Sequence, residues 1–147
     1  MAHDSHPCPD DNLQTAVLLI AHGSRSPSAN EEFAELARQV QARIPFQRVE
    51  IAFLEVVRPT VEEAAERCVQ AGATRVLLLP YFLFSGTHGL NDVERLWGEL
   101  QRRHPNVAFS ICRPLGVHPS LVDVVLDRVF EVVSKPKSPP NLPADSS

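Results

Sequence analysis

The chain has 147 residues, which is the length of one domain. Of these residues 44% are hydrophobic and 22% are charged, and this composition excludes a chain that is disordered throughout. Its net charge of −4 argues against a nucleic-acid partner, which is usually met by a basic surface. Cys8, Cys68 and Cys112 lie far apart and form no Cys-x-x-Cys pair, as in proteins of reducing compartments. The N-terminus lacks an apolar signal core, and no apolar run is long enough to span a bilayer. We therefore expect a soluble, cytoplasmic protein without a membrane partner.

The two ends of the chain differ in composition from its middle. Residues 1–13 are polar, and residues 134–147 are rich in proline. We expect a flexible N-terminal tail, one α/β domain over residues 14–133, and a disordered C-terminal tail. His3, Asp4, His6 and Cys8 in the N-terminal tail are potential metal ligands, but a solvated tail is the favoured interpretation because such ligands lack a scaffold.

The first strand and helix are expected directly after the N-terminal tail. The apolar run "AVLLIA" at residues 16–21 is typical of a strand buried on both faces. Apolar residues at helical spacing predict a helix over residues 26–44. Ser28 or Asn30 is expected to cap its start, with two glutamates in its first turn.

The second strand and helix carry clearer boundary signals. A strand is predicted over residues 49–55 and a helix over residues 60–73. Thr60 suits the N-cap position, and Glu63 three residues later completes a capping box. Gly72 can end this helix.

The alternation of strands and helices continues to the end of the domain. Residues 75–84 hold the third strand, followed by a helix over 90–104, a strand over 107–112 and a helix over 119–133. This order predicts a four-stranded parallel sheet covered by helices on both faces, a flavodoxin-like three-layer sandwich. We expect the strand order 2-1-3-4.

Ligands of open parallel sheets bind beyond the carboxyl ends of the strands, and polar residues stand at each of these ends. His22 follows the first strand, Glu55 the second, His88 the third and His118 the fourth. Two histidines and a glutamate form a ligand set that suits Co²⁺, Fe²⁺, Ni²⁺ or Zn²⁺ and leaves coordination positions open. Each residue also has a structural alternative: Glu55 can pair with Arg58, and His118 can cap the helix that follows it.

Two loops at this edge are candidates for ligand binding. The segment "GSRSPSAN" precedes a helix, where amides and hydroxyls can hold an anion. The segment "FLFSGTH" could lie against a flat apolar ligand, with Gly86 and Gly89 permitting movement or close approach. Alternatively, Tyr81, Phe82 and Phe84 continue the buried third strand.

Four segments together resemble one known family. "AHGSRSP", "FLEVVRPTVEEA", "LLLPYFLFSGTHGLND" and "RPLGVHPSL" are similar to the sirohydrochlorin chelatases of the short, single-domain cobaltochelatase/ferrochelatase type. The similarity covers about residues 16–130, in order and without large insertions. It implies the chelatase fold, as one half of the two-domain chelatase architecture.

The resemblance also implies an activity. It predicts a lyase that inserts Co²⁺ or Fe²⁺, with Ni²⁺ possible, into the tetrapyrrole sirohydrochlorin without ATP, in cobalamin or sirohaem biosynthesis. No cofactor beyond the substrate metal is expected, and the short form implies a homodimer whose pocket is shared. The family's catalytic and metal-binding residues fall on His22, His88 and Glu55: the imidazoles bind the metal and accept pyrrole protons, and the carboxylate assists.

Sirohydrochlorin bears many carboxylates, so the expected site needs cations and polar donors near the histidines. The candidate substrate-binding residues are Ser24, Arg25, Arg58, Phe84, Ser85, Gly86, Thr87 and Arg113. Two other functions stay open. One is a histidine phosphatase, although Ala21 stands where that motif has arginine; the other is a non-catalytic metal-binding or delivery protein of the same fold.

Overall fold

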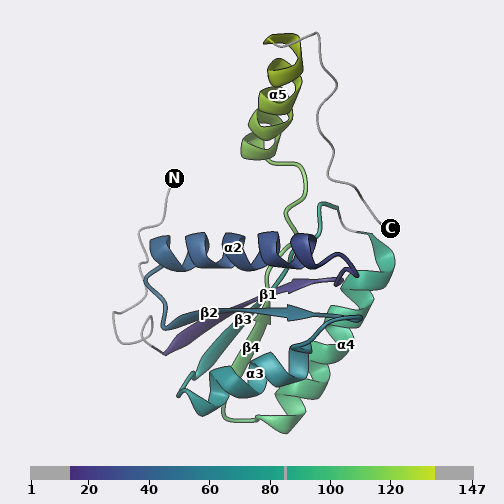
Figure 1. Cartoon of the computed structure of the whole chain (residues 1–147). Helices are drawn as coiled ribbons and strands as arrows, with labels where there is room; N and C mark the ends of the chain where they lie inside the picture. Colours follow the sequence, from purple (N-terminus) through teal and green to yellow (C-terminus); the bar gives the residue numbers. More distant parts are fainter. Residues whose placement is uncertain (1–13, 85, 135–147) are drawn as a thin grey trace.

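The computed structural model describes residues 14–84 and 86–134, and the two predicted tails therefore lie almost entirely outside the described residues. Four parallel strands form one sheet in the order β2-β1-β3-β4, which confirms the predicted order (Figure 1). The strands are β1 (Thr15–Ala21), β2 (Arg48–Phe53), β3 (Arg75–Pro80) and β4 (Ala108–Ile111). The α/β fold class predicted from the alternation of elements is confirmed.

Three of the four helices form the outer layers. They are α2 (Pro27–Arg43) on one face of the sheet, and α3 (Val61–Gln70) and α4 (Thr87–Arg103) on the other (Figure 1). The fourth helix, α5 (Pro119–Ser134), stands away from the sheet and none of its described residues is buried. Helices thus cover both faces as expected, but within the part of the chain that the structure describes one face carries a single helix.

The central strand β1 is buried on both sides because it lies between two hydrophobic cores. Ala16, Leu18 and Ile20 face α3 and α4, whereas Val17 and Leu19 face α2. Burying a side chain of this size stabilises the fold by about 1.5–3 kcal/mol. The continuous apolar run of this strand is therefore a consequence of its central position in a parallel sheet.

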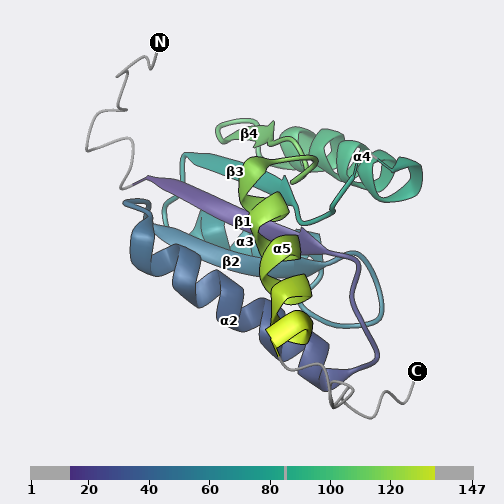
Figure 2. The same cartoon turned by 90° about the horizontal axis from the view of Figure 1, so that it is seen from above.

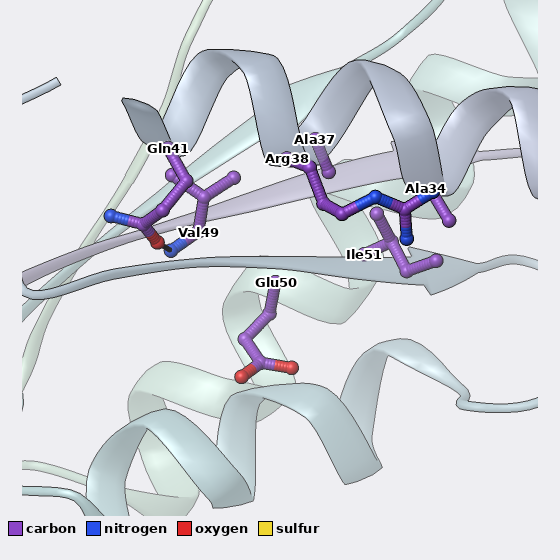
Figure 3. A pocket seen from close by; sticks show the side chains of 7 residues that line it. All are labelled: Ala34, Ala37, Arg38, Gln41, Val49, Glu50 and Ile51. Carbon is purple, nitrogen blue, oxygen red and sulfur yellow. Dashed lines mark hydrogen bonds between the residues drawn. The ribbon is translucent and has the colours of Figure 1, made fainter. Parts of the chain in front are cut away.

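Glutamine side chains cover both edges of the sheet. The backbone N–H of Val49 in β2 donates to Oε1 of Gln41 over 2.6 Å, as Figure 3 shows. At β4, the N–H of Phe109 donates to Oε1 of Gln101 over 3.1 Å. A pocket of about 290 Å³ remains beside β2, and Glu50 points from this strand toward the opposite side of the sheet (Figure 3). None of the residues that line this pocket is a predicted site residue. The two glutamines occupy backbone N–H groups at the sheet edges and so hinder pairing of the edge strands with another chain.

Helix α2 lies within the predicted range of residues 26–44, but its capping residue differs from the prediction. Ser26, rather than Ser28 or Asn30, is its N-cap and accepts a hydrogen bond from the N–H of Ala29. Pro27 occupies the first helical position, where its fixed φ and missing N–H are tolerated. The predicted capping residues were wrong, and the two glutamates consequently lie beyond the first turn.

Helix α3 begins and ends as predicted. Thr60 and Glu63 form the full capping box, with the N–H of Thr60 donating to Oε1 of Glu63 over 2.9 Å. At the other end, Gly72 has a φ of +99°, which glycine adopts without strain. The N–H of Ala73 donates to the carbonyl of Cys68 over 3.0 Å, so the helix closes in a Schellman motif.

The ion pair between Arg58 and Glu63 makes the stability of the fold sensitive to acid. Hydrogen bonds from Arg58 and from the backbone of Thr60 lower the pKa of Glu63 from 4.5 to about 2. A carboxyl with a depressed pKa contributes stability above its unfolded-state pKa, and this contribution is lost as the pH falls from 4.5 to about 2. We expect Glu63→Gln to lower the free energy of unfolding at pH 7, and the difference from the wild type to shrink below pH 4.5. Urea titrations at pH 7, 4 and 3 measure it, with Glu62→Gln as the control that leaves these bonds intact; a difference independent of pH would contradict the assignment.

Candidate functional site

The loops after β1 and β2 are joined through their backbones at the carboxyl edge of the sheet. The N–H of Leu54 donates to the carbonyl of Ala21 over 2.9 Å, and the N–H of Glu55 donates to the carbonyl of His22 over 3.0 Å. These bonds continue the β1–β2 pairing beyond the last residues of the two strands. Two of the three predicted catalytic residues are therefore neighbours, and their backbones are fixed by the sheet.

Gly23 allows this close approach of the two loops. Its φ is +102°, and a Cβ built on it would overlap the carbonyl oxygen of Glu55. A residue with a side chain would have to adopt a disfavoured backbone conformation and also displace that carbonyl. Glycine at this position is thus a steric requirement for the juxtaposition of His22 and Glu55.

The loop that carries Glu55 contains a strained residue. Val56 has a φ of +74°, and the N–H of Val57 donates to the carbonyl of Glu55 over 2.8 Å, which forms a γ-turn. A positive φ is uncommon for a β-branched residue and costs on the order of 1–3 kcal/mol. The side chain of Val56 is 60% exposed, so burial does not compensate for this cost. Strained backbone of this kind often occurs at functional sites.

The imidazole of His22 stacks on the ring of Phe82. Their centroids are 4.5 Å apart and the rings are inclined by 21°. Phe82 itself is half-buried against the core that lies under α3 and α4. One face of the imidazole is thus covered by an anchored aromatic ring, which restricts the orientation of the histidine.

Gly89, in the first turn of α4, lies against this stack. A Cβ on Gly89 would come within 2.6 Å of Phe82 Cε2 and 2.9 Å of His22 Cε1. The predicted close approach is confirmed at Gly89, whereas Gly86 has open space around it. The strand ends at Pro80 rather than continuing through the aromatic residues, and Phe84 is 65% exposed.

His88 precedes Gly89 and lies in the first turn of α4, because this helix begins at Thr87 rather than at the predicted residue 90. The side chains of His22, Glu55 and His88 are all exposed at the same end of the sheet. Among residues 14–84 and 86–134, no group of three or more His, Cys, Asp or Glu side chains is arranged to hold a metal ion. The fold gathers the predicted ligands at one edge without enclosing them, and the proposed ligand set stays a prediction.

Three of the predicted substrate-binding residues line one open hollow. Ser24, Arg25 and Arg58 lie around a depression of about 570 Å³ between the loops that follow β1 and β2. Arg58 pairs with Glu63 rather than with Glu55, which was its expected alternative partner. Arg25 remains exposed at the surface.

Asn30, which was considered only as a helix cap, organises the loop that was expected to bind an anion. The N–H of Ser24 donates to Oδ1 of Asn30 over 3.2 Å, and Nδ2 of Asn30 donates to the carbonyl of Ser24 over 2.8 Å. The hydroxyl of Ser24 accepts from the N–H of Ser26 over 3.0 Å. These groups hold the loop shape, and the asparagine six residues after Ser24 was the sequence signal for it.

The segment after β4 completes this edge of the sheet. The N–H of Leu115 donates to the carbonyl of Phe82 over 3.0 Å, which connects the segment to the His22 stack. Arg113 is exposed nearby in sequence, and Nδ1 of His118 accepts from the N–H of Ser120 over 3.0 Å. The predicted capping role of His118 is confirmed. Ser85 lies outside the described residues, as does the side chain of Thr87.

The parallel sheet and the histidines at its carboxyl edge define an α/β protein of the chelatase type. Comparison with known proteins agrees: the model of the CbiX family matches residues 16–132. This chain belongs to the CbiX family of sirohydrochlorin chelatases.

Individual relatives show the same similarity. The chain is 33% identical over 118 residues to the chloroplastic sirohydrochlorin ferrochelatase of Arabidopsis thaliana, covering 80% of this chain and 52% of that protein. It is 30% identical over 139 residues to the sirohydrochlorin cobaltochelatase of Methanocaldococcus jannaschii, covering 78% of this chain and 97% of the relative. The structure of the chelatase SirB from Bacillus subtilis subspecies spizizenii in complex with cobalt superposes with a TM-score of 0.77 at 30% identity, covering 82% of this chain and 51% of that one. The chain thus spans about half the length of several relatives and nearly the whole length of others.

We expect Val56→Gly to raise the stability of the protein. The substitution removes a strain on the order of 1–3 kcal/mol, and the greater flexibility of glycine in the unfolded chain offsets about 0.5–1 kcal/mol of that gain. Denaturant titration should therefore give an increase of about 1 kcal/mol in the free energy of unfolding. Val57→Gly is the matched control and should lower stability, because Val57 packs against the core beside α2. If Val56→Gly lost as much stability as the control, the positive φ of Val56 would not be a source of strain.

Proposed function

We propose that this chain is a lyase that inserts Co²⁺ or Fe²⁺ into sirohydrochlorin without ATP, in cobalamin or sirohaem biosynthesis. Its family membership and the names of its relatives support the reaction class. The observation that carries the proposal is the oriented imidazole of His22, which lies on Phe82 at the sheet edge beside Glu55. The metal is a substrate in this reaction, and no resident cofactor is proposed.

The proposed mechanism uses the two imidazoles as metal ligands and as bases. Two pyrrole N–H protons must leave the macrocycle as one divalent ion enters it. A neutral imidazole can hold a first-row ion and accept a proton near neutral pH. His22 and His88 would hold the ion through their basic nitrogens, and each nitrogen would accept one pyrrole proton after the ion has passed from it to the macrocycle. Glu55 would orient an imidazole or pass protons to solvent. The stack on Phe82 restricts the ring of His22 to one orientation, which lowers the entropic cost of reaching the reactive geometry.

The carboxylates of sirohydrochlorin require cations at the rim of the site. Arg25 lines the hollow next to the His22 loop, and Arg113 lies on the segment attached to Phe82. Neither guanidinium is in an ion pair within the described part of the chain, so both are available to bind a carboxylate. The exposed ring of Phe84 and the segment from Ser85 to Thr87 would lie against the macrocycle.

We propose that the protein works in the cytoplasm as a homodimer whose two chains line the tetrapyrrole pocket. The open, exposed arrangement of His22, Glu55 and His88 on one chain supports a shared site. The segment that several relatives share with this chain is about half of their length, which leaves room for a second domain of the same size. In the described segments, no helix is long and apolar enough to cross a bilayer. Neither a nucleic acid nor a membrane belongs to the proposed set of partners.

Turnover distinguishes this function from metal delivery. Substoichiometric protein is mixed with sirohydrochlorin and either Co²⁺, Fe²⁺ or Ni²⁺, and the visible spectrum is followed. A chelatase yields many equivalents of metallated product per chain, and the ion with the highest kcat/KM identifies the preferred substrate. Rates equal to those of free metal without protein would overturn the proposal and favour a binding or delivery role.

Replacing either histidine should abolish most of this activity without unfolding the protein. We expect His22→Ala and His88→Ala each to lower kcat/KM by on the order of 100-fold or more, because each removes a ligand and a base. Both side chains are exposed, so the circular dichroism spectrum and the urea midpoint should change little. His118→Asn, which keeps a capping side chain at the start of α5, is the control. Unchanged rates in both alanine variants would show that the site lies elsewhere.

Gly89→Ala tests the importance of the His22–Phe82 stack. The added methyl group overlaps both rings, and we expect kcat/KM to fall on the order of 10- to 100-fold through displacement of the imidazole. Gly98→Ala is the matched control in the same helix, because its Cβ meets only Arg102 Nη1 at 3.5 Å. Alanine at position 98 should keep the rate and raise stability by up to about 1 kcal/mol. Equal rates in the two variants would exclude a role for the stack.

A further inference from the structure

The loop that follows β1 is tied to the first turn of α2 by the side chain of Asn30. Its amide forms two hydrogen bonds with the backbone of Ser24, accepting from the N–H over 3.2 Å and donating to the carbonyl over 2.8 Å. Because one bond is accepted and the other is donated, the two together fix both the position and the orientation of the Ser24 backbone. Figure 2, seen from above, shows this loop reaching from the end of β1 to the start of α2, at the same end of the sheet as the loop that follows β2.

These two bonds are not needed to start the helix. Ser26 is the N-cap and accepts from the N–H of Ala29, and Pro27 at the first helical position has no N–H to satisfy. Ser24 lies two residues before the N-cap, so the amide of Asn30 fixes a segment that is outside α2. The asparagine thus connects the loop after β1 to a helix that is packed on the sheet.

Arg25 lies between two residues whose backbones are fixed. Ser24 before it is held by Asn30, and the N–H of Ser26 after it donates to the hydroxyl of Ser24 over 3.0 Å. The side chain of Arg25 is exposed and lines the hollow between the loops after β1 and β2. Since the N–H of Ser24 is already bonded to Asn30, the loop offers an anion the guanidinium of Arg25 rather than this amide.

Arg25 also supplies the unpaired charge of this hollow. Arg58 lines the hollow too but pairs with Glu63, and the lining residue Glu31 pairs with Arg38 over 3.0 Å. Among the described residues that line the hollow, Arg25 is thus the only charged side chain outside an ion pair. A carboxylate is the ligand that suits such a guanidinium, because its two oxygens match the paired N–H groups.

We propose that Asn30 is a positioning residue for substrate binding: it fixes the backbone of Ser24 and thereby holds Arg25 where its guanidinium binds a carboxylate of sirohydrochlorin. The inference rests on the proposed function and adds to it a residue that touches neither the metal nor the macrocycle. A loop that is already fixed loses less conformational freedom when the substrate arrives, and the substrate therefore binds more tightly.

The effect of Asn30 falls on binding rather than on metal insertion. His22 lies on the same loop, but other contacts hold it: its carbonyl accepts from the N–H of Glu55, and its ring stacks on Phe82. Loss of the Asn30 bonds leaves these contacts in place. The imidazole therefore keeps its orientation when Arg25 loses its own.

A double-mutant cycle tests whether Asn30 acts through Arg25. The affinity for metal-free sirohydrochlorin is measured by titration of its visible spectrum with the wild type, Asn30→Ala, Arg25→Gln and the variant that carries both substitutions. We expect each single substitution to raise Kd on the order of 10-fold, and the double variant to bind no more weakly than Arg25→Gln alone. Gln39→Ala is the matched control and should bind like the wild type, because it removes another amide from α2, one that bonds only to the side chain of Glu35.

Unchanged affinity in Asn30→Ala would overturn the proposal. An effect of Asn30→Ala that stays on the order of 10-fold when Arg25 is already replaced would also overturn it, because the asparagine would then act on something else. The circular dichroism spectrum and the urea midpoint are recorded for every variant. Loss of the cooperative urea transition in Asn30→Ala would show that the fold itself depends on this residue and would overturn the positioning role as well.

Steady-state metal insertion separates binding from chemistry. We expect KM for sirohydrochlorin to rise on the order of 10-fold in Asn30→Ala while kcat stays within about twofold of the wild type, and a fall in kcat at unchanged KM would contradict the proposal. Wild-type protein that binds sirohydrochlorin but inserts no metal would refute the proposed function, and the binding cycle would still decide the role of Asn30. Wild-type protein that does not bind sirohydrochlorin would overturn both.

Discussion

The parallel pairing of β1 with β2 is the constraint on which the candidate site depends. The pairing does not stop with the strands, because the backbone of Leu54 and Glu55 bonds to that of Ala21 and His22 beyond them. The backbones of His22 and Glu55 are therefore placed by main-chain hydrogen bonds, which do not depend on the rotamers of the side chains. The burial of β1 between two cores anchors this arrangement, since any shift of the strand would disturb both hydrophobic layers.

Glycine and strained backbone allow the loops to approach as closely as they do. Because Gly23 has no side chain, the carbonyl of Glu55 can lie against it, and for the same reason the rings of His22 and Phe82 can lie against Gly89. Val56 adopts a costly conformation in the same region. The geometry of this edge is thus maintained against local preference by the stability of the sheet, which is how a binding site on loops can be preorganised.

The uneven covering of the sheet leaves an apolar groove that reaches toward the site. In the described residues one face has two helices, while the other has α2 and an apolar groove of about 410 Å³. The groove reaches Leu115, and through its hydrogen bond it reaches the support of His22.

The sequence by itself determined the order of strands and helices, because apolar runs and helical spacing report burial along the chain. It also placed the capping box at Thr60 and Glu63, the end of α3 at Gly72 and the capping role of His118, since these depend on neighbouring residues. The N-cap of α2 was misplaced because several adjacent residues can cap a helix, and the position of Pro27 at the first turn favours Ser26. The sequence further located the histidines and the glutamate at strand ends.

Only the tertiary structure decided which of these residues meet. The stack of His22 on Phe82 joins two strands far apart in sequence, and the role of Asn30 in the loop of Ser24 depends on how that loop folds back. Arg58 lies close in sequence to both Glu55 and Glu63, and in the folded chain it forms its ion pair with Glu63. The separation of α5 from the sheet could not be predicted from periodicity, because an apolar stripe on a helix does not show whether the helix packs on the sheet of its own chain. Local sequence patterns indicate which residues are buried, because they depend on neighbours along the chain. The residues that each of them contacts depend on the packing of segments far apart in the sequence.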